Sequence, residues 1–106
     1  DDESCINFCL LGGHGVISVC SHVAPQSMVN WIERALSKDS GIREDFRAQQ
    51  LWIQKLYMTS NPIPVKAALK AKGIIEEHET RLPLIALDKE STKSLMATIG
   101  EFKGLS

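Results

Sequence analysis

Cysteines and histidines are concentrated near the start of the chain, where their side chains suit metal chemistry. Cys5 and Cys9 are four residues apart, which would place both thiols on one side of a helix, and His14 and His22 follow nearby. Thiolate and imidazole are the ligands that zinc prefers, but this spacing matches no closed structural set. Free cysteine is among the most buried residue types. We therefore expect these thiols, with Cys20, to pack in the core without a bound metal.

Composition limits the compartment and the partners. The cysteine count of three is odd and no cysteine follows residue 20, so a disulfide framework is not expected. Reduced thiols predict a cytoplasmic protein. A formal net charge of −1 gives no electrostatic reason to expect nucleic acid or an anionic membrane as a partner. No apolar run approaches the roughly 20 residues that span a bilayer.

Four further side chains could take part in acid–base or nucleophilic chemistry. Asp1 and Asp2 form an acidic pair that could act as general acid and base. Because they precede a predicted helix, we expect helix capping instead, with Asp2 as the cap. Tyr57, the only tyrosine, and Lys66 both fall in predicted helices. We expect Tyr57 to pack and Lys66 to lie at the surface with a half-buried stem.

The element that would have to position any site here is a single predicted strand. Residues 15–20 read Gly-Val-Ile-Ser-Val-Cys, a near-continuous apolar run typical of a strand in a parallel sheet. Its backbone groups would need neighbouring strands as partners, and nothing else in the chain reads as clearly as a strand. The chain also begins at Asp1 without an initiator Met. We therefore expect a piece of a larger α/β enzyme.

The remaining elements are predicted to be helices. Gly12 and Gly73 are placed to end two of them, Pro25 opens another, and Asp88 caps the last. We expect helices over residues 3–11, 25–38, 42–58, 62–72 and 89–102. The second of these is expected to bury Met28, Val29, Ile32, Ala35 and Leu36. The order helix, strand, helix and then three helices is typical of the end of a parallel α/β barrel or doubly wound sheet, followed by a bundle.

Two runs of sequence resemble the dihydrodipicolinate synthase family. They are LGGHGVISV at residues 11–19 and NPIPVK at residues 61–66, and RLPL at residues 81–84 extends the match in the right order. The resemblance implies the C-terminal part of a (β/α)8 TIM barrel (helix 7, strand 8 and helix 8) in residues 1–38. It implies an appended three-helix C-terminal domain in residues 39–106, so the segment itself is mostly α.

The resemblance also implies a reaction. The family condenses pyruvate with L-aspartate-4-semialdehyde on the route to diaminopimelate and lysine, through a Schiff base between pyruvate and a lysine. That lysine, a tyrosine relay and a substrate-binding arginine do not map onto this chain. We therefore expect no catalytic residue here, and an inactive segment. No metal or organic cofactor is implied, and the implied partners are the two substrates, the remainder of the barrel and further copies in a cytoplasmic homotetramer.

Candidate substrate contacts lie on the predicted strand. In a barrel the active site forms at the C-terminal ends of the strands. By resemblance, the backbone carbonyl of Ile17 lies near the Schiff-base amine, and Gly15 and Val16 flank the pyruvate pocket. Glycine permits close backbone approach because it has no side chain. The alternative for Ile17 is a residue that only fills the barrel interior.

Two other functions remain open at this point. A related pyruvate-dependent sugar-acid aldolase, such as N-acetylneuraminate lyase, shares the glycine-rich entry to the strand, although the NPIPVK run is more specific to the synthase branch. A non-catalytic helical interaction module would require residues 15–20 to pair between copies, or to be helix or loop. His22 and Ala86 depart from the family pattern and bear on the subfamily.

Overall fold

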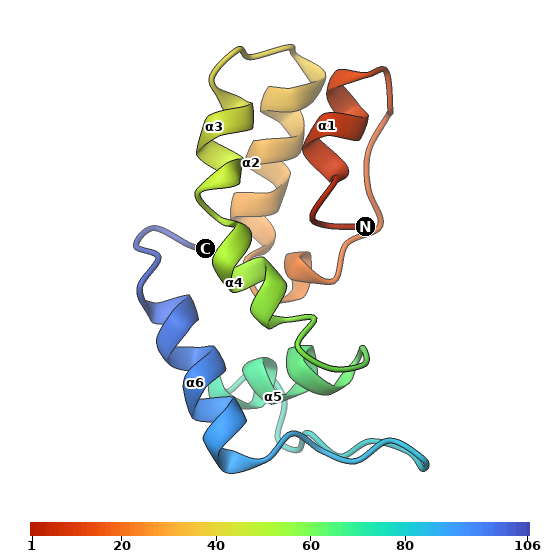
Figure 1. Cartoon of the computed structure of the whole chain (residues 1–106), viewed down its shortest axis with the longest axis vertical. Coiled ribbons are helices and arrows are strands. Elements are labelled where there is room, and N and C mark those ends of the chain that lie inside the picture. Colours follow the sequence, from red (N-terminus) through yellow and green to blue (C-terminus); the bar gives the residue numbers. More distant parts are fainter.

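The computed structural model describes all of residues 1–106, and its regular elements are all helices. The helices α1, α2 and α3 pack against one another at one end of an elongated molecule, and α5 packs against α6 at the other (Figure 1). Helix α4 joins the two ends. The elements are α1 (Cys5–Leu10), the 3₁₀ turn η1 (Cys20–His22), α2 (Pro25–Leu36), α3 (Ile42–Arg47), α4 (Gln50–Lys55), α5 (Ile63–Ala71) and α6 (Lys89–Gly100). None of them combines the length and apolar character needed to cross a membrane.

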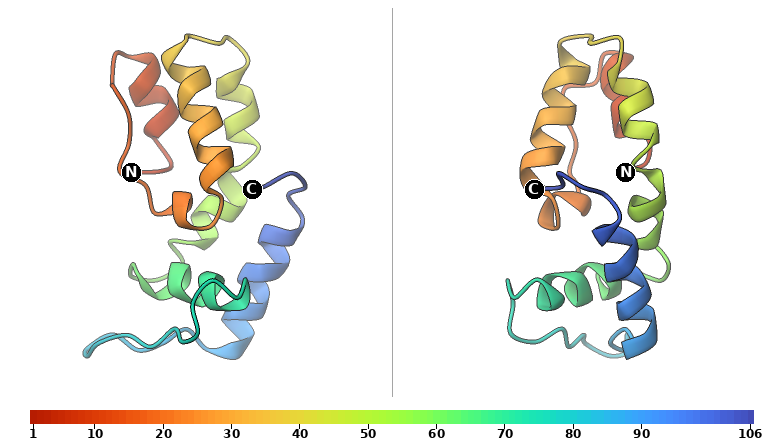
Figure 2. Two further views of the ribbon diagram at one scale, coloured as in Figure 1. Left: turned by 180° about the vertical axis from the view of Figure 1, so that it is seen from behind. Right: turned by 90° about the vertical axis from the view of Figure 1, so that its left-hand side faces the viewer.

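One hydrophobic core, centred on aromatic side chains, runs through the molecule. The rings of Trp31 and Phe46 meet edge to face with centroids 5.5 Å apart, and those of Trp31 and Trp52 lie 6.5 Å apart. Trp52 is completely buried, and its Nε1 donates a hydrogen bond to Oε1 of Gln49 at 3.0 Å. The C-terminus closes this core against α2, where the N–H of Ser27 donates to the carbonyl of Ser106 at 2.7 Å (Figure 2).

Local signals place most helix ends correctly. Oδ1 of Asp88 accepts the N–H of Ser91 at 2.8 Å, so the predicted cap of α6 is confirmed. Gly12 and Gly73 follow α1 and α5 with φ of +110° and +72°. Glycine adopts this left-handed conformation without the steric cost of a Cβ atom. Pro25 is the first residue of α2, as expected.

The helix predicted over residues 42–58 is wrong, because α3 and α4 are separate and the second ends at Lys55. The chain tightens between them, where the N–H of Gln49 bonds to the carbonyl of Phe46, three residues back, at 3.0 Å. In one continuous helix, residues six apart would lie about 240° apart around the axis. The break therefore lets Phe46 and Trp52 enter the same core.

The predicted inner face of α2 needs a smaller correction. Met28 and Ala35 are buried, but Val29 is 50% and Leu36 42% exposed, and Trp31 is buried in their place. The large indole ring of Trp31 takes the position that faces α3 and α4. The buried face of α2 is therefore rotated around the helix axis relative to the predicted one. The spacing in residues 89–102 predicts an inner face of Leu95, Met96, Ile99 and Phe102. Leu95 and Ile99 are buried, and Met96 and Phe102 pack half-buried against the core.

Residues 15–20 do not form the predicted strand. The N–H groups of the five residues 14–18 donate no hydrogen bond within the chain, and Cys20 already belongs to η1. A strand needs a partner strand for its hydrogen-bond ladder, and the chain supplies none. The segment is therefore a long unpaired connection from α1 to η1 (Figure 1).

We predict that Asp88→Ala lowers the free energy of unfolding by about 1 kcal/mol, because the first turn of α6 loses its side-chain acceptor. Urea denaturation followed by circular dichroism measures the change. Lys93→Ala, at an exposed position of the same helix, is the control and should stay within about 0.5 kcal/mol of wild type. Equal losses for the two variants would contradict the capping role.

Candidate functional site

The three predicted substrate contacts lie on the unpaired connection, beside α2. Gly15 and Val16 line a shallow apolar hollow against that helix, and Val16 is half-buried on the core. Ile17 is fully exposed and does not line the hollow. The structure thus groups Gly15 with Val16 and leaves the side chain of Ile17 apart. The other residues around the hollow are Ser18, Ser21, Met28, Val29, Ile32 and Glu33.

A buried carboxylate fixes the end of this connection. Asp2 has no exposed surface, and its Oδ2 accepts three hydrogen bonds. The donors are the N–H of Val19 at 3.0 Å, the N–H of Cys20 at 2.9 Å and the hydroxyl of Tyr57 at 2.7 Å. The connection therefore becomes anchored where it turns into η1.

The predicted helix cap is wrong, because Ser4 is the N-cap residue of α1 and no side chain bonds to the first turn of that helix. Asp2 does not cap α1; instead, Oδ1 of Asp1 accepts the N–H of Ser4 at 3.2 Å, just before that helix begins. Two adjacent carboxylates thus serve different elements. Asp1 binds the nearby backbone. Asp2 binds the backbone of Val19 and Cys20, which lie 17 and 18 positions further along the chain.

Hydrogen bonding keeps Asp2 charged despite its burial. Burial alone would raise the pKa of this carboxyl, but the hydroxyls of Ser18 and Tyr57 and the N–H of Cys20 outweigh it, and the pKa is lowered. Burial, the hydrogen bond to Asp2 and the negative charge there raise the pKa of Tyr57. At neutral pH the tyrosine hydroxyl is therefore the donor and the carboxylate the acceptor.

The role of Tyr57 could not be found from the sequence, which predicted packing alone. Tyr57 lies 55 residues from Asp2, just after α4, and no local spacing signal joins the two. Lys66 is half-buried and its Nζ donates to the backbone carbonyl of Glu79, in keeping with the predicted surface position. His14 and His22 are both exposed.

The three cysteines pack in the core, as predicted. Cys5, Cys9 and Cys20 are free thiols with at most 2% exposure. Burial, with the negative charge of Asp2 as the next cause, raises the pKa of Cys5 to about 12 and also raises that of Cys20. These two thiols are therefore protonated at neutral pH. No group of three or more His, Cys, Asp or Glu side chains is arranged to hold a metal ion.

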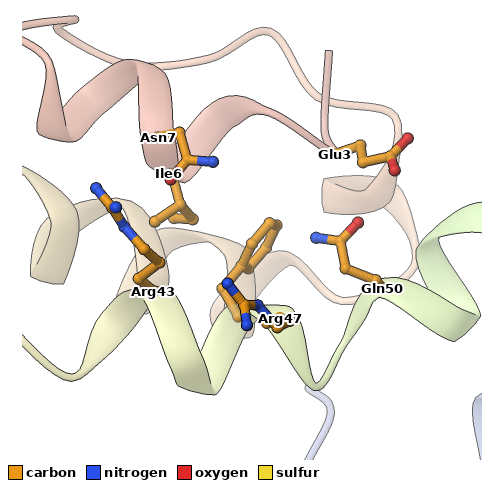
Figure 3. Close-up of a pocket in the computed structure, with 7 residues that line it drawn as sticks. Glu3, Ile6, Asn7, Arg43, Arg47 and Gln50 are labelled. Carbon is orange, nitrogen blue, oxygen red and sulfur yellow. The ribbon is translucent and has the colours of Figure 1, made fainter.

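A second hollow lies between α1 and the α3–α4 pair and contains none of the predicted site residues (Figure 3). Arg43 and Arg47 project from α3 at its edge, and neither forms an ion pair. Both arginines are exposed.

Comparison with known proteins defines the class. The sequence pattern of the dihydrodipicolinate synthetase family matches residues 1–102. The chain is 46% identical over 101 residues to the 4-hydroxy-tetrahydrodipicolinate synthase of Bdellovibrio bacteriovorus, covering 92% of this chain and 33% of that protein. It is 42% identical over 91 residues to the synthase of the same name from Psychromonas ingrahamii, covering 85% and 31%.

Solved structures agree with the sequence match. The dihydrodipicolinate synthase of Thermotoga maritima superimposes with a TM-score of 0.87 at 37% identity, over 95% of this chain and 34% of that one. A monomeric dihydrodipicolinate synthase variant gives 0.88 at 37% identity, over 100% and 35%.

The chain belongs to the dihydrodipicolinate synthetase family and corresponds to a C-terminal portion of it. It spans about a third of the length of the relatives it matches. The predicted fold class, the end of a TIM barrel plus appended helices, is confirmed. The division at residue 38 and the roles of Gly15, Val16 and Ile17 stay predictions.

We predict that Asp2 makes the chain sensitive to acid. Its folded-state pKa is lowered, so its contribution to stability is present above the unfolded pKa of about 3.9 and is lost as pH falls through the folded value. Thermal unfolding between about pH 6 and pH 2 measures this loss. Asp2→Asn should reduce Tm at neutral pH and flatten its fall in acid.

Glu44→Gln is the matched control, because Glu44 is exposed and its side chain accepts no hydrogen bond. This variant should follow the wild-type dependence of Tm on pH. If Asp2→Asn follows it too, the buried carboxylate contributes nothing to the acid response.

Proposed function

We propose that this chain forms part of a lyase that condenses pyruvate with L-aspartate-4-semialdehyde through a lysine Schiff base, in diaminopimelate and lysine biosynthesis. The observation that carries the proposal is the family match over residues 1–102, with relatives that bear the name of that synthase. The proposal includes a cytoplasmic location and assembly as a homotetramer. The catalytic lysine lies outside these 106 residues.

In the proposed reaction, the amine of that lysine attacks the keto carbon of pyruvate and water leaves. The protonated imine accepts the electron pair when a proton leaves the methyl carbon, and the resulting enamine attacks the aldehyde carbon. The proposed contribution of this chain to the pyruvate site is made by backbone groups. We propose that the carbonyl of Ile17 orients the amine and that Gly15 and Val16 flank the pyruvate pocket. In support, no group within the chain donates to the Ile17 carbonyl.

The remainder of the barrel is the proposed partner of the bare side of the connection. Ile17 is fully exposed there, and Phe8 and Leu11 of the preceding helix and turn are also largely exposed. Large apolar side chains that are exposed in this way are candidates for burial against a partner. Neighbouring strands would cover it and pair with the free N–H groups of residues 14–18.

The test of the proposed function is chemical trapping. The complete open reading frame that encodes this chain is expressed and treated with pyruvate and sodium borohydride. We expect one covalent adduct, the reduced imine, on a lysine that precedes Asp1, because borohydride converts the imine to a stable secondary amine. Mass spectrometry of a digest locates it, and an assay with L-aspartate-4-semialdehyde measures the condensation.

The 106-residue chain alone is the control and should gain no adduct, although it contains Lys66 and other lysines. An adduct without condensation, accompanied by cleavage of N-acetylneuraminate, would replace the synthase with a sugar-acid aldolase. An open reading frame without further sequence, or no adduct at all, would contradict the proposal.

Hydrogen exchange tests the proposed barrel partner. In the 106-residue chain the amides of residues 14–18 should exchange nearly as fast as in an unfolded peptide, since they donate no hydrogen bond. In the complete gene product, strand pairing should protect them. The amides of Ala68 and Leu95, buried residues within α5 and α6, serve as references. Equally fast exchange of residues 14–18 in both proteins would exclude a strand at this position.

A further inference from the structure

We infer that Asp2 and Tyr57 are positioning residues for the proposed pyruvate site, acting through the backbone of the connection that carries Ile17. The inference rests on the proposed function. Neither side chain touches Ile17. Both meet at one atom, Oδ2 of Asp2, which also accepts the N–H groups of Val19 and Cys20.

No backbone N–H between Gly13 and Val19 donates a hydrogen bond, although Val16 packs on the core and Ser18 is hydrogen-bonded to Ser21. Upstream, the last bonded amide is that of Gly13, which donates to the carbonyl of Phe8 at 2.9 Å. Downstream, the next bonded amide is that of Val19, which donates to Asp2. The carbonyl of Ile17 lies two residues before this second anchor. Within this chain, the position of that carbonyl therefore depends on the turn at residues 18–21, which Asp2 anchors through Val19 and Cys20 and which the hydrogen bonds between Ser18 and Ser21 close.

Asp2 is suited to set this position. Two successive N–H groups on one carboxylate oxygen fix the two peptide planes on either side of Val19. Hydrogen bonds to an ionised acceptor are about twice as strong as neutral ones, and the side chain is fully buried, so water does not compete. Pairing with neighbouring barrel strands would fix the position of residues 14–18 across the sheet. The hydrogen bonds to Asp2 fix the position at which the strand ends.

Tyr57 joins the helical tail to the same anchor. Its ring is 40% exposed, yet its hydroxyl reaches the buried Oδ2 at 2.7 Å, the shortest of the three contacts. Tyr57 follows directly after α4 and Leu56, which is fully buried in the core. The end of α4 thus fixes the tyrosine, and the tyrosine in turn restrains the carboxylate.

The experiment measures steady-state kinetics of the complete gene product with Tyr57→Phe, Asp2→Asn and Asp2→Ala. Misplacing a reacting group by about 1 Å costs on the order of a hundredfold in rate. We expect kcat/KM for pyruvate to fall about tenfold in Tyr57→Phe and about a hundredfold in Asp2→Ala, with Asp2→Asn between them. The KM for the aldehyde substrate should stay within about twofold of wild type, because the connection is proposed to contact only the pyruvate side.

Asp88→Ala is the matched control. Asp88 also accepts a backbone N–H and a hydroxyl, both from Ser91, but it lies at the start of α6 and outside the connection. The Asp88→Ala variant should have a lower Tm than wild type, and its kcat and KM values should be unchanged. If Asp2→Ala does not fold, Tyr57→Phe and Asp2→Asn carry the test.

The outcomes separate the two proposals. Wild-type protein that forms no borohydride adduct with pyruvate overturns the proposed function, and this inference with it. Active wild type with Tyr57→Phe and Asp2→Asn variants that lose only thermal stability, as Asp88→Ala does, overturns the inference and leaves the function standing. Kinetic constants that worsen equally for pyruvate and for the aldehyde substrate would also overturn the inference, since they would indicate general disorder of the site.

Discussion

Five successive backbone N–H groups, those of residues 14–18, have no acceptor anywhere in this chain. Backbone groups of this kind are paired in nearly every buried setting, because an unpaired group away from water costs as much as a lost hydrogen bond. In the 106 residues this cost is avoided only by leaving the segment at the surface, with Ile17 fully exposed. The bare side of α1 and the open hollow against α2 follow from the same constraint.

A second constraint is the buried charge of Asp2. A carboxylate without exposed surface normally needs a cationic partner, and here no lysine or arginine pairs with it. Three donors on one oxygen take that place, from Val19, Cys20 and Tyr57. They come from the connection and from the end of α4. The charge therefore joins residues 19 and 20 to Tyr57 and gives this junction a defined geometry.

The helical tail, residues 39–106, is held together by the packing of apolar side chains more than by ion pairs. The break between α3 and α4 brings Phe46 and Trp52 into one core with Trp31 of α2, so residues on both sides of position 38 share the same packing. Helices α3 and α4 are thereby held against α2 through these rings. That rigidity is what allows a residue of the tail, Tyr57, to restrain a carboxylate at the start of the chain.

The sequence by itself determined the features that depend on neighbours within a few residues. Pro25, Gly73 and Asp88 set helix ends through local backbone chemistry. The apolar run at residues 15–20 predicted a piece of a larger α/β protein, because its need for partners is a property of the segment itself, and the family motifs specified the end of a barrel. The family motifs supplied the candidate contacts Gly15, Val16 and Ile17, whose roles remain predictions.

Only the tertiary structure decided which groups meet across long separations. The break at residues 48–49, the exposure of Val29 and the bond from Tyr57 to Asp2 all depend on how the aromatic core fills and on which donors surround a buried charge. The periodicity of apolar residues describes one helix at a time, and it does not identify the residues that pack against that helix. For this reason the sequence assigned Asp2 to the nearest helix, whereas packing placed its carboxylate at the end of the next segment.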